Sequence, residues 1–410
     1  MSVAGAGKVV QMPSPFAAPN AKARTGIEER KMRQKLLIVS DAVTAPSGLA
    51  RITRELAERL HVNLYDVIDV ATCGYGGVGS NSIPWTDYHL NSIENWVIPE
   101  LPQVAKDFAG DEELTILVIW DCSRLAWFAD PDYCPIPSLR AWLQKAKIRK
   151  WTYSAIDAAG PQGGLSVNLK RILGGFERVL NYSKFSAQVT GYPDFIPHGI
   201  DTSAFFPHDR NASKDAFRAM GFVGLERSSF LIGIVATNQV RKDWALGFQT
   251  AKELLDRGKD VRLWCHVDTI QRFWDLGALV EDYGLQGRVI ITVTTFTDEQ
   301  MSLLYSACDV VLAIGRGEGF GFSAYESLAS GTPIVAGNYC GSEWTPPSMK
   351  VMPIGFNYEG PHCMKRPVYE VKDWADCAEE QEGVIASLPA ELDWEKVWVK
   401  WEKWFRDGLR

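Results

Sequence analysis

Two carboxylates, Glu318 and Glu326, flank a glycine-rich stretch in the second half of this 410-residue chain. An apolar run at 310–314 precedes the glycines and predicts a short buried strand. Residues 323–330 predict a helix, which Gly331 ends. A glycine loop that leads into a helix exposes backbone N–H groups, and these groups bind anions such as phosphate. The stretch therefore predicts an anion site with two acids beside it.

The two acids restrict the kind of ligand that this loop can bind. A phosphate site does not need carboxylates, because they repel phosphate. Carboxylates do accept hydrogen bonds from hydroxyl groups. A ligand that carries both phosphates and many hydroxyls is a nucleotide sugar. The alternative is an ordinary strand, loop and helix with incidental acids.

The segment EGFGFSAYESLASGTPIV, residues 318–335, resembles the retaining glycosyltransferases of the GT-B fold, family 4 in particular. Their signature is Glu, seven residues, Glu, with Gly-Phe-Gly after the first Glu and Glu-(Ser/Ala)-(Leu/Met)-Ala-x-Gly-x-Pro at the second. The resemblance implies an α/β chain with two Rossmann-like domains that face each other across a donor/acceptor cleft. It also implies a retaining hexosyltransferase, which moves a sugar from a nucleotide-diphosphate sugar to a hydroxyl acceptor.

The resemblance assigns roles to individual residues of the donor site. Glu326 would hold the ribose hydroxyls, and Glu318 would hold hydroxyls of the transferred sugar. Arg241 and Lys242 match an Arg and a Lys that bind the donor diphosphate, although the family's pair usually stands several residues apart. Asn238 lies nearer the usual Arg position, and a solvated Arg–Lys pair is the alternative. Further donor-binding candidates are Gly48, Phe320, Gly321 and Phe322.

The chemistry of such a site requires that a departing nucleoside diphosphate be stabilised. Two cations and a helix N-terminus can neutralise that charge without a metal ion. The departing phosphate can itself take the proton of the acceptor, so that no protein base is required. We therefore expect a metal-independent enzyme with no cofactor other than the nucleotide sugar that it consumes.

The first half of the chain resembles the family in architecture only. Residues 35–40 predict a strand and 49–60 a helix, and Gly48 between them is the counterpart of a family glycine that faces the donor phosphate. Asp121 and Asp157 follow two apolar runs that predict buried parallel strands, and ligands bind at that end of such strands. Both are candidates for contacts with acceptor hydroxyls, and local hydrogen bonding in the loops is the alternative.

The domain organisation follows from the same resemblance. We expect a disordered tail at 1–34, an acceptor domain at 35–198 and a nucleotide-sugar domain at 199–385. The chain from 386 to 410 contains an amphipathic helix with an aromatic stripe, which would cross back and dock on the first domain. A helix on a membrane surface is the alternative. Two further expectations are a helix at 270–283 and irregular chain at 350–371.

Composition restricts the setting of the protein. The net charge of −7 argues against a broad nucleic-acid surface, although six Lys and Arg residues at 22–35 could bind a polyanion. No apolar run is long enough to span a bilayer, and the first residues lack the features of a secretory signal. The eight cysteines and six histidines show no zinc spacing. These features favour a cytoplasmic protein with reduced thiols.

Other functions remain compatible with the sequence. A sugar-nucleotide epimerase of the same fold and a non-catalytic nucleotide-sugar-binding subunit would share the donor site. A glycogen-phosphorylase-like enzyme would need a pyridoxal-binding lysine, for which we find no context. The sequence predicts the reaction class but not the donor sugar, its base, the oligomeric state or the acceptor, which could be a glycan, lipid, protein or modified DNA.

Overall fold

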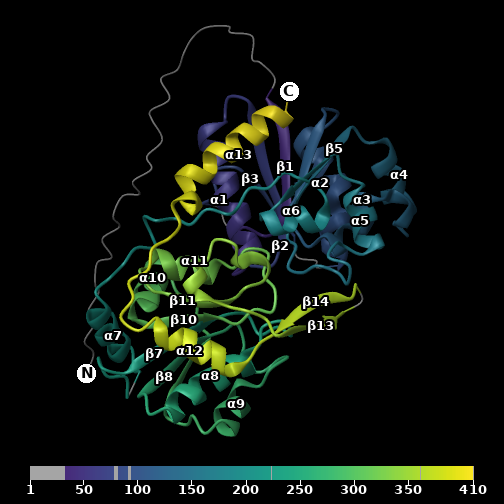
Figure 1. The fold of residues 1–410 in the computed structure, drawn as a ribbon. Coiled ribbons are helices and arrows are strands. Elements are labelled where there is room, and N and C mark those ends of the chain that lie inside the picture. The colour runs from purple at the N-terminus through teal and green to yellow at the C-terminus, as the bar shows by residue number, and fades with distance from the viewer. Residues whose placement is uncertain (1–32, 78–81, 91–93, 223, 361, 410) are drawn as a thin grey trace, which may run out of the picture. The chain divides into compact units, whose positions relative to one another are not determined.

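Two six-stranded sheets form the framework of the protein in the computed structural model (Figure 1). The structure describes residues 33–77, 82–90, 94–222, 224–360 and 362–409. The predicted tail at 1–34 therefore lies, except for its last two residues, outside the described residues.

The first sheet is wholly parallel and has the strand order β3-β2-β1-β4-β5-β6. Its central strands are buried on both faces, β1 over residues 36–40 and β4 throughout, as expected for a parallel sheet covered by helices. The strands are β1 (Gln34–Asp41), β2 (Ile68–Tyr75), β3 (Thr86–Leu90), β4 (Leu114–Val118), β5 (Ile148–Ser154) and β6 (Arg178–Asn181). The helices are α1 (Gly48–Asn63), α2 (Leu101–Ala109), α3 (Ala126–Ala129), α4 (Pro137–Lys145), α5 (Val167–Leu173) and α6 (Lys184–Thr190).

The second sheet is also parallel and has the order β12-β11-β10-β7-β8-β9. Its strands are β7 (Phe230–Val235), β8 (Val261–His266), β9 (Val289–Thr292), β10 (Val310–Ala313), β11 (Ile334–Gly337) and β12 (Lys350–Val351). The helices in this half of the chain are α7 (Arg210–Ala219), α8 (Trp244–Asp256), α9 (Leu276–Asp282), α10 (Asp298–Ala307), α11 (Phe322–Ala329), α12 (Val371–Glu380) and α13 (Trp394–Gly408). The predicted α/β architecture with two Rossmann-like units is confirmed.

Strand order determines where ligands can bind in each sheet. β1 lies between β2 and β4, so the chain leaves β1 and β4 toward opposite sides of the first sheet. β7 and β10 stand in the same relation in the second sheet. In open parallel sheets the carboxyl ends of such a strand pair form the binding crevice. The loops after these four strands are therefore the places to look for a site.

The structure differs from the predicted elements in three places. The helix expected at 270–283 is limited to α9, because Asp275 caps it by accepting a hydrogen bond from the Ala278 N–H at 3.0 Å. The segment at 350–371 is not irregular: it contains β12 and an antiparallel hairpin of β13 (Gly355–Glu359) and β14 (Met364–Val368). Strand β3, at the edge of the first sheet, was also not expected.

The C-terminal helix α13 packs on the first sheet, as the sequence predicts (Figure 1). The ring centroids of Trp401 and Tyr153 are 4.8 Å apart, and those of Trp404 and Trp151 are 4.9 Å apart. The Arg178 guanidinium also donates a hydrogen bond to the Trp404 carbonyl at 2.9 Å. The aromatic stripe of α13 is thus buried against protein. Among the described helices, none is both long and apolar enough to cross a bilayer.

Replacing Trp401 by Ala should lower the free energy of unfolding by about 3–5 kcal/mol, because the indole is 1% exposed and its removal leaves a large cavity. Denaturant unfolding followed by circular dichroism measures this loss. Val399→Ala is the matched control on the same helix, since Val399 is 65% exposed and its loss should stay within about 0.5 kcal/mol. Equal effects of the two substitutions would contradict the docking of α13.

Candidate active site

The glycine loop between β10 and α11 has the geometry that the sequence predicts. Gly321 stands at the N-cap of α11 with φ +93°, and Gly331 follows the helix with φ +82°, two conformations that favour glycine. No side chain caps the N-terminus of α11. Gly321, Ser323 and Ala324 of this uncapped first turn line a pocket.

The pocket lies at the carboxyl ends of strands β7, β10 and β11. Its walls combine the end of β7, the glycine loop, the start of α11 and the segment after β11. The residues that line it include Val235, Lys242, Gly315, Glu318, Phe320, Gly321, Ser323, Ala324, Tyr339 and Gly341. This is the edge of the second sheet at which the strand order predicts a ligand.

Glu318 is the carboxylate that contacts this pocket. Its Oε2 lies 2.9 Å from Nη1 of Arg241, and Lys242 Nζ contacts Oε1. Burial opposes ionisation of Glu318, but the two cations outweigh it and lower the pKa to about 2. Gly315 is needed beside them, because a Cβ at that position would collide with the Glu318 carboxylate. The structure thus brings together Arg241, Lys242 and Glu318, three of the predicted site residues.

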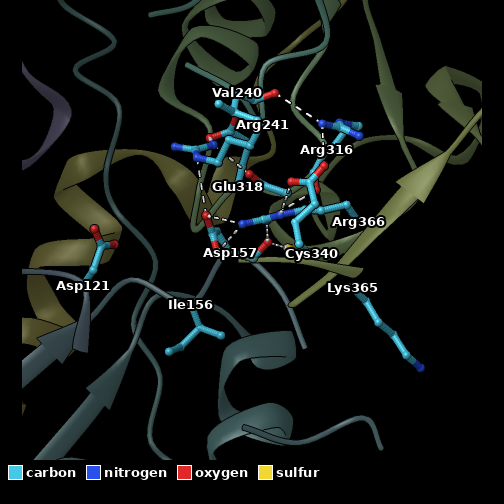
Figure 2. A network of polar contacts seen from close by, with 12 residues as sticks. Asp121, Ile156, Asp157, Val240, Arg241, Arg316, Glu318, Cys340, Lys365 and Arg366 are labelled. Atoms are coloured by element: carbon cyan, nitrogen blue, oxygen red, sulfur yellow. Dashed lines mark hydrogen bonds and ion pairs between the residues drawn. The ribbon is translucent and has the colours of Figure 1, made fainter. Parts of the chain in front are cut away.

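Asp157 belongs to the same network, which Figure 2 shows in close view. Its carboxylate lies 3.4 Å from Nε of Arg241 and 3.3 Å from Nη2 of Arg366. Its carbonyl accepts hydrogen bonds from Arg366 Nη1 at 3.0 Å and from Cys340 Sγ at 2.9 Å. Asp157 follows β5 of the first sheet, whereas the two arginines come from the second half of the chain. The network therefore joins loops of both sheets.

The hairpin β13–β14 supplies the part of the network that sequence reasoning missed. Arg366 on β14 is 8% exposed, and Glu359 on β13 lies 3.6 Å from its Nε. Arg316, from the glycine loop, approaches the same Glu359 at 2.6 Å. Lys365 points away from these groups in Figure 2. The sequence gave no indication that Arg366 belongs to the site, because its segment was expected to be irregular and Asp157 is far away in sequence.

Glu326 has a different set of partners from Glu318. Nη1 of Arg51 lies 2.5 Å from its carboxylate, and the Tyr305 hydroxyl donates a hydrogen bond at 2.9 Å. Burial raises the pKa of Glu326, and Arg51 and Tyr305 oppose that rise. Arg51 also contacts Asp298 at 3.0 Å and Glu55 at 2.9 Å. Arg51 is thus a further cation of the site to which the sequence analysis gave no role.

The aromatic residues of the signature pack beside these charges. Phe320 is 4% exposed, and the Phe322 ring lies parallel to the His198 ring at 5.2 Å between centroids. A Cβ at Gly48 would lie 3.4 Å from the Phe322 ring, so the start of α1 lies against the start of α11. His198 is buried, its Nδ1 lies 2.8 Å from the Tyr153 hydroxyl, and burial lowers its pKa well below 6.5. These surroundings suit a structural role for His198.

Asn238 does not join the group around Glu318. Its side chain is fully buried and binds the backbone after β8: the amide donates to the Trp274 carbonyl at 2.8 Å and accepts from the Trp274 N–H at 2.9 Å. The Asn238 N–H donates to Asp268 at 2.6 Å. These contacts use the polar atoms of the amide within the protein, so that its observed task is to hold the loop at 268–274.

Asp121 and the acidic residues that could bind a metal ion are the last candidates to be placed. The Asp121 side chain is 47% exposed and lies 3.5 Å from Arg124. Asp130 and Asp132 form an Asp-x-Asp pair, but Asp130 accepts a hydrogen bond from the Asp132 N–H at 3.1 Å and pairs with Arg171 at 2.9 Å. Within the described residues, no group of three or more His, Cys, Asp or Glu side chains is arranged to hold a metal ion.

Comparison with known proteins relates this geometry to a class of enzymes. The HepE protein of Anabaena, solved with UDP and glucose, superposes with a TM-score of 0.66 at 14% identity, over 92% of this chain and 100% of that one. Sucrose-phosphate synthase of Thermosynechococcus elongatus superposes with a TM-score of 0.62 at 16% identity, over 92% and 99%. The fold is thus the GT-B fold of two-domain glycosyltransferases.

The comparison with protein-family models matches a shorter part of the chain, which contains the glycine loop. Residues 253–344 match the model of "Glycosyl transferases group 1". The matched segment contains Glu318, Glu326 and the glycine loop between them. A D-inositol 3-phosphate glycosyltransferase of Corynebacterium urealyticum is 30% identical over 147 residues, 34% of this chain and 34% of that protein. The aligned part thus spans about a third of that relative. The resemblance to group 1 glycosyltransferases is confirmed for this segment.

The charge state of Glu318 predicts a pH dependence of stability. Because its folded-state pKa of about 2 lies below the ordinary 4.5, ionised Glu318 stabilises the fold above pH 4.5, and this stabilisation is lost as the pH falls toward 2. Glu318→Gln should therefore show a shallower loss of unfolding free energy than the unsubstituted protein between pH 5 and pH 3, measured by urea titration. Glu281→Gln, on the exposed side of α9, should keep the original slope. Parallel curves for Glu318→Gln and the unsubstituted protein would refute the ion-paired state.

Gly317 is the residue of the loop that tolerates a side chain least. Its φ is +141°, and a Cβ would collide with the Asp157 carbonyl and the Arg366 guanidinium. Gly317→Ala should therefore destabilise the protein by at least about 2 kcal/mol in thermal or urea unfolding. Gly355→Ala is the control, because a Cβ there meets no atom within 4 Å. An unchanged midpoint for Gly317→Ala would show that the loop does not need this contact.

Proposed function

We propose that this protein is a retaining, metal-independent hexosyltransferase that moves a sugar from a nucleotide-diphosphate sugar to an acceptor hydroxyl. The observation that carries the proposal is the group of Glu318, Arg241 and Lys242 beside the open N-terminus of α11. The group 1 segment at 253–344 supports it, as do relatives whose names describe sugar transfer. The HepE structure, which holds UDP and glucose, supports a nucleotide-sugar donor.

The donor site in this proposal belongs to a domain at 199–385, opposite an acceptor domain at 35–198. The pocket at the ends of β7, β10 and β11 takes the nucleotide sugar. Arg241, Lys242 and the N–H groups near Gly321 and Phe322 bind the diphosphate. Gly48, next to Phe322, leaves room for the phosphates to approach α1.

The two glutamates have separate tasks because their surroundings differ. Glu318 stays ionised between two cations and accepts hydrogen bonds from hydroxyls of the transferred sugar. Glu326 is oriented by Arg51 and Tyr305, and its carboxylate accepts hydrogen bonds from the ribose hydroxyls. Asn238 acts indirectly, since its contacts hold the loop after β8.

The reaction breaks the bond between the anomeric carbon and the diphosphate oxygen and forms a bond from that carbon to the acceptor oxygen on the same face. The pair of electrons leaves with the diphosphate, whose growing charge Arg241, Lys242 and the start of α11 stabilise. The acceptor hydroxyl gives its proton to the departing phosphate oxygen. Charge stabilisation of this kind requires neither a metal ion nor a protein base.

Glu326→Ala should abolish most donor binding, whereas the unsubstituted protein should melt roughly 3 °C or more higher with its donor nucleotide at saturation. The test is a thermal-shift screen against UDP, GDP, ADP and their glucose, mannose and N-acetylglucosamine conjugates, followed by calorimetry. Glu299→Ala is the control, because Glu299 is exposed on α10 near the same site.

Two results would contradict the proposal in different ways. Normal donor affinity of Glu326→Ala would overturn the assignment of the ribose site. The nucleotide-sugar donor itself would be overturned if no nucleotide at millimolar concentration raised the melting temperature of the unsubstituted protein or of Lys242→Ala.

A further inference from the structure

A line of polar contacts joins the start of helix α13 to the proposed ribose carboxylate. The Trp394 indole N–H donates a hydrogen bond to Oε2 of Glu55 on α1. Oε1 of Glu55 accepts a hydrogen bond from Nε of Arg51 at 2.9 Å, and Nη1 of Arg51 lies 2.5 Å from Oε1 of Glu326. We call these four side chains the polar bridge. It connects helices α13, α1 and α11, which are far apart in sequence.

The polar bridge is largely shielded from water. Trp394 is 3% exposed, and the side chains of Glu55 and Glu326 are 12% and 8% exposed. Hydrogen bonds to charged groups are short and directional, and they are stronger where water is largely excluded. A change at one end of the bridge therefore alters the orientation of the group at its other end.

The guanidinium of Arg51 is shared among three carboxylates. Its Nε binds Glu55, its Nη1 binds Glu326, and its Nη2 lies 3.0 Å from Asp298 at the start of α10. Because it is shared in this way, Arg51 meets Glu326 through Oε1, while the Tyr305 hydroxyl donates to Oε2 at 2.9 Å.

Glu55 determines how Arg51 meets Glu326. An arginine that is not held elsewhere commonly binds a carboxylate through two parallel N–H groups. Such a pair of bonds would occupy both oxygens of Glu326, which the ribose hydroxyls need as acceptors. With Nε bound to Glu55 and Nη2 bound to Asp298, only Nη1 remains for Glu326. The contact with Glu55 thus preserves the capacity of Glu326 to accept further hydrogen bonds.

Trp394 fixes Glu55 from the place where the polypeptide connects the two halves of the molecule. The Ile200 N–H donates to the Leu392 carbonyl at 2.8 Å, and the Trp394 N–H donates to the Ile200 carbonyl at 3.3 Å. The Trp394 ring lies against Gly199, where a Cβ would collide with it. The indole that binds Glu55 is therefore held by both connecting segments.

We propose that Glu55 and Trp394 are positioning residues for the donor. They restrict Arg51 to one oxygen of Glu326, and they thereby make recognition of the nucleotide's ribose depend on the docked start of α13. Neither residue touches the donor itself. This inference rests on the proposed function, and it extends the donor site to residues outside the group 1 segment at 253–344.

The test compares the nucleoside diphosphate that the thermal-shift screen identifies with its 2′,3′-dideoxy form. In calorimetry, the unsubstituted protein should bind the ribose form about thirtyfold more tightly, because the dideoxy form lacks the hydroxyls that Glu326 accepts. Glu55→Gln removes the charge that holds Nε of Arg51 and should reduce this ratio about tenfold. Trp394→Phe removes only the N–H and should reduce it about threefold. The affinity for the dideoxy form should change less than about twofold in both variants.

Two matched substitutions serve as controls. Trp401→Phe changes another buried indole of α13, and the Trp401 N–H has no hydrogen-bond partner within the described residues. Glu58→Gln changes an exposed glutamate of α1. Both should keep the original ratio. The melting temperature of each variant without nucleotide shows that folded proteins are compared.

The outcomes separate this inference from the proposed function. An unchanged ratio in either variant overturns the positioning role of that residue and leaves the proposed function intact. Equal weakening of the ribose and dideoxy forms overturns it as well, because that result indicates a merely structural effect. A ratio near one in the unsubstituted protein overturns Glu326 as the ribose group and, with it, this inference. A protein that binds no nucleotide overturns the proposed function itself.

Discussion

Compensation of one partly buried negative charge organises the candidate site. Glu318 is ionised inside the protein because Arg241 and Lys242, adjacent in sequence, both reach its carboxylate. A buried charge that loses one partner is strongly destabilising, since the remaining field no longer offsets the loss of hydration. The loop between β10 and α11 must therefore keep the backbone that presents Glu318, and Gly315 and Gly317 allow that backbone to pass close to its neighbours.

The same kind of charge pairing links elements that lie far apart in sequence. Arg51 on α1 reaches Glu326 on α11, and Arg241 reaches Asp157 beyond β5. Apolar contacts alone tolerate small sliding movements, whereas charged hydrogen bonds fix both distance and direction. The proposed donor residues thus depend on groups from both sheets. The arrangement explains why a group 1 segment that ends at residue 344 does not contain the whole site.

The sequence was most informative where local pattern and chemistry coincide. The strand, glycine loop and helix around Glu318 were predicted because glycine positions, apolar runs and helix ends are local signals. Arg366 was not predicted, because only tertiary contact brings it to Asp157. Asn238 was expected near the donor, yet its amide is used by the backbone around Trp274, a contact that spacing does not reveal. The extent of the helix ending at Asp282 was overestimated for a similar reason: capping by Asp275 outweighed the apolar pattern before it.

The packing of α13 on the first sheet has a consequence for the order in which the protein can mature. Residues 394–408 are synthesised after every strand of that sheet, yet they cover Trp151 and Tyr153 on β5. Until they arrive, the growing chain carries an uncovered aromatic surface on the sheet that was synthesised first, and exposed surface of this kind is prone to aggregation. Completion of the first half of the molecule thus waits for residues that are synthesised after every strand of the second sheet.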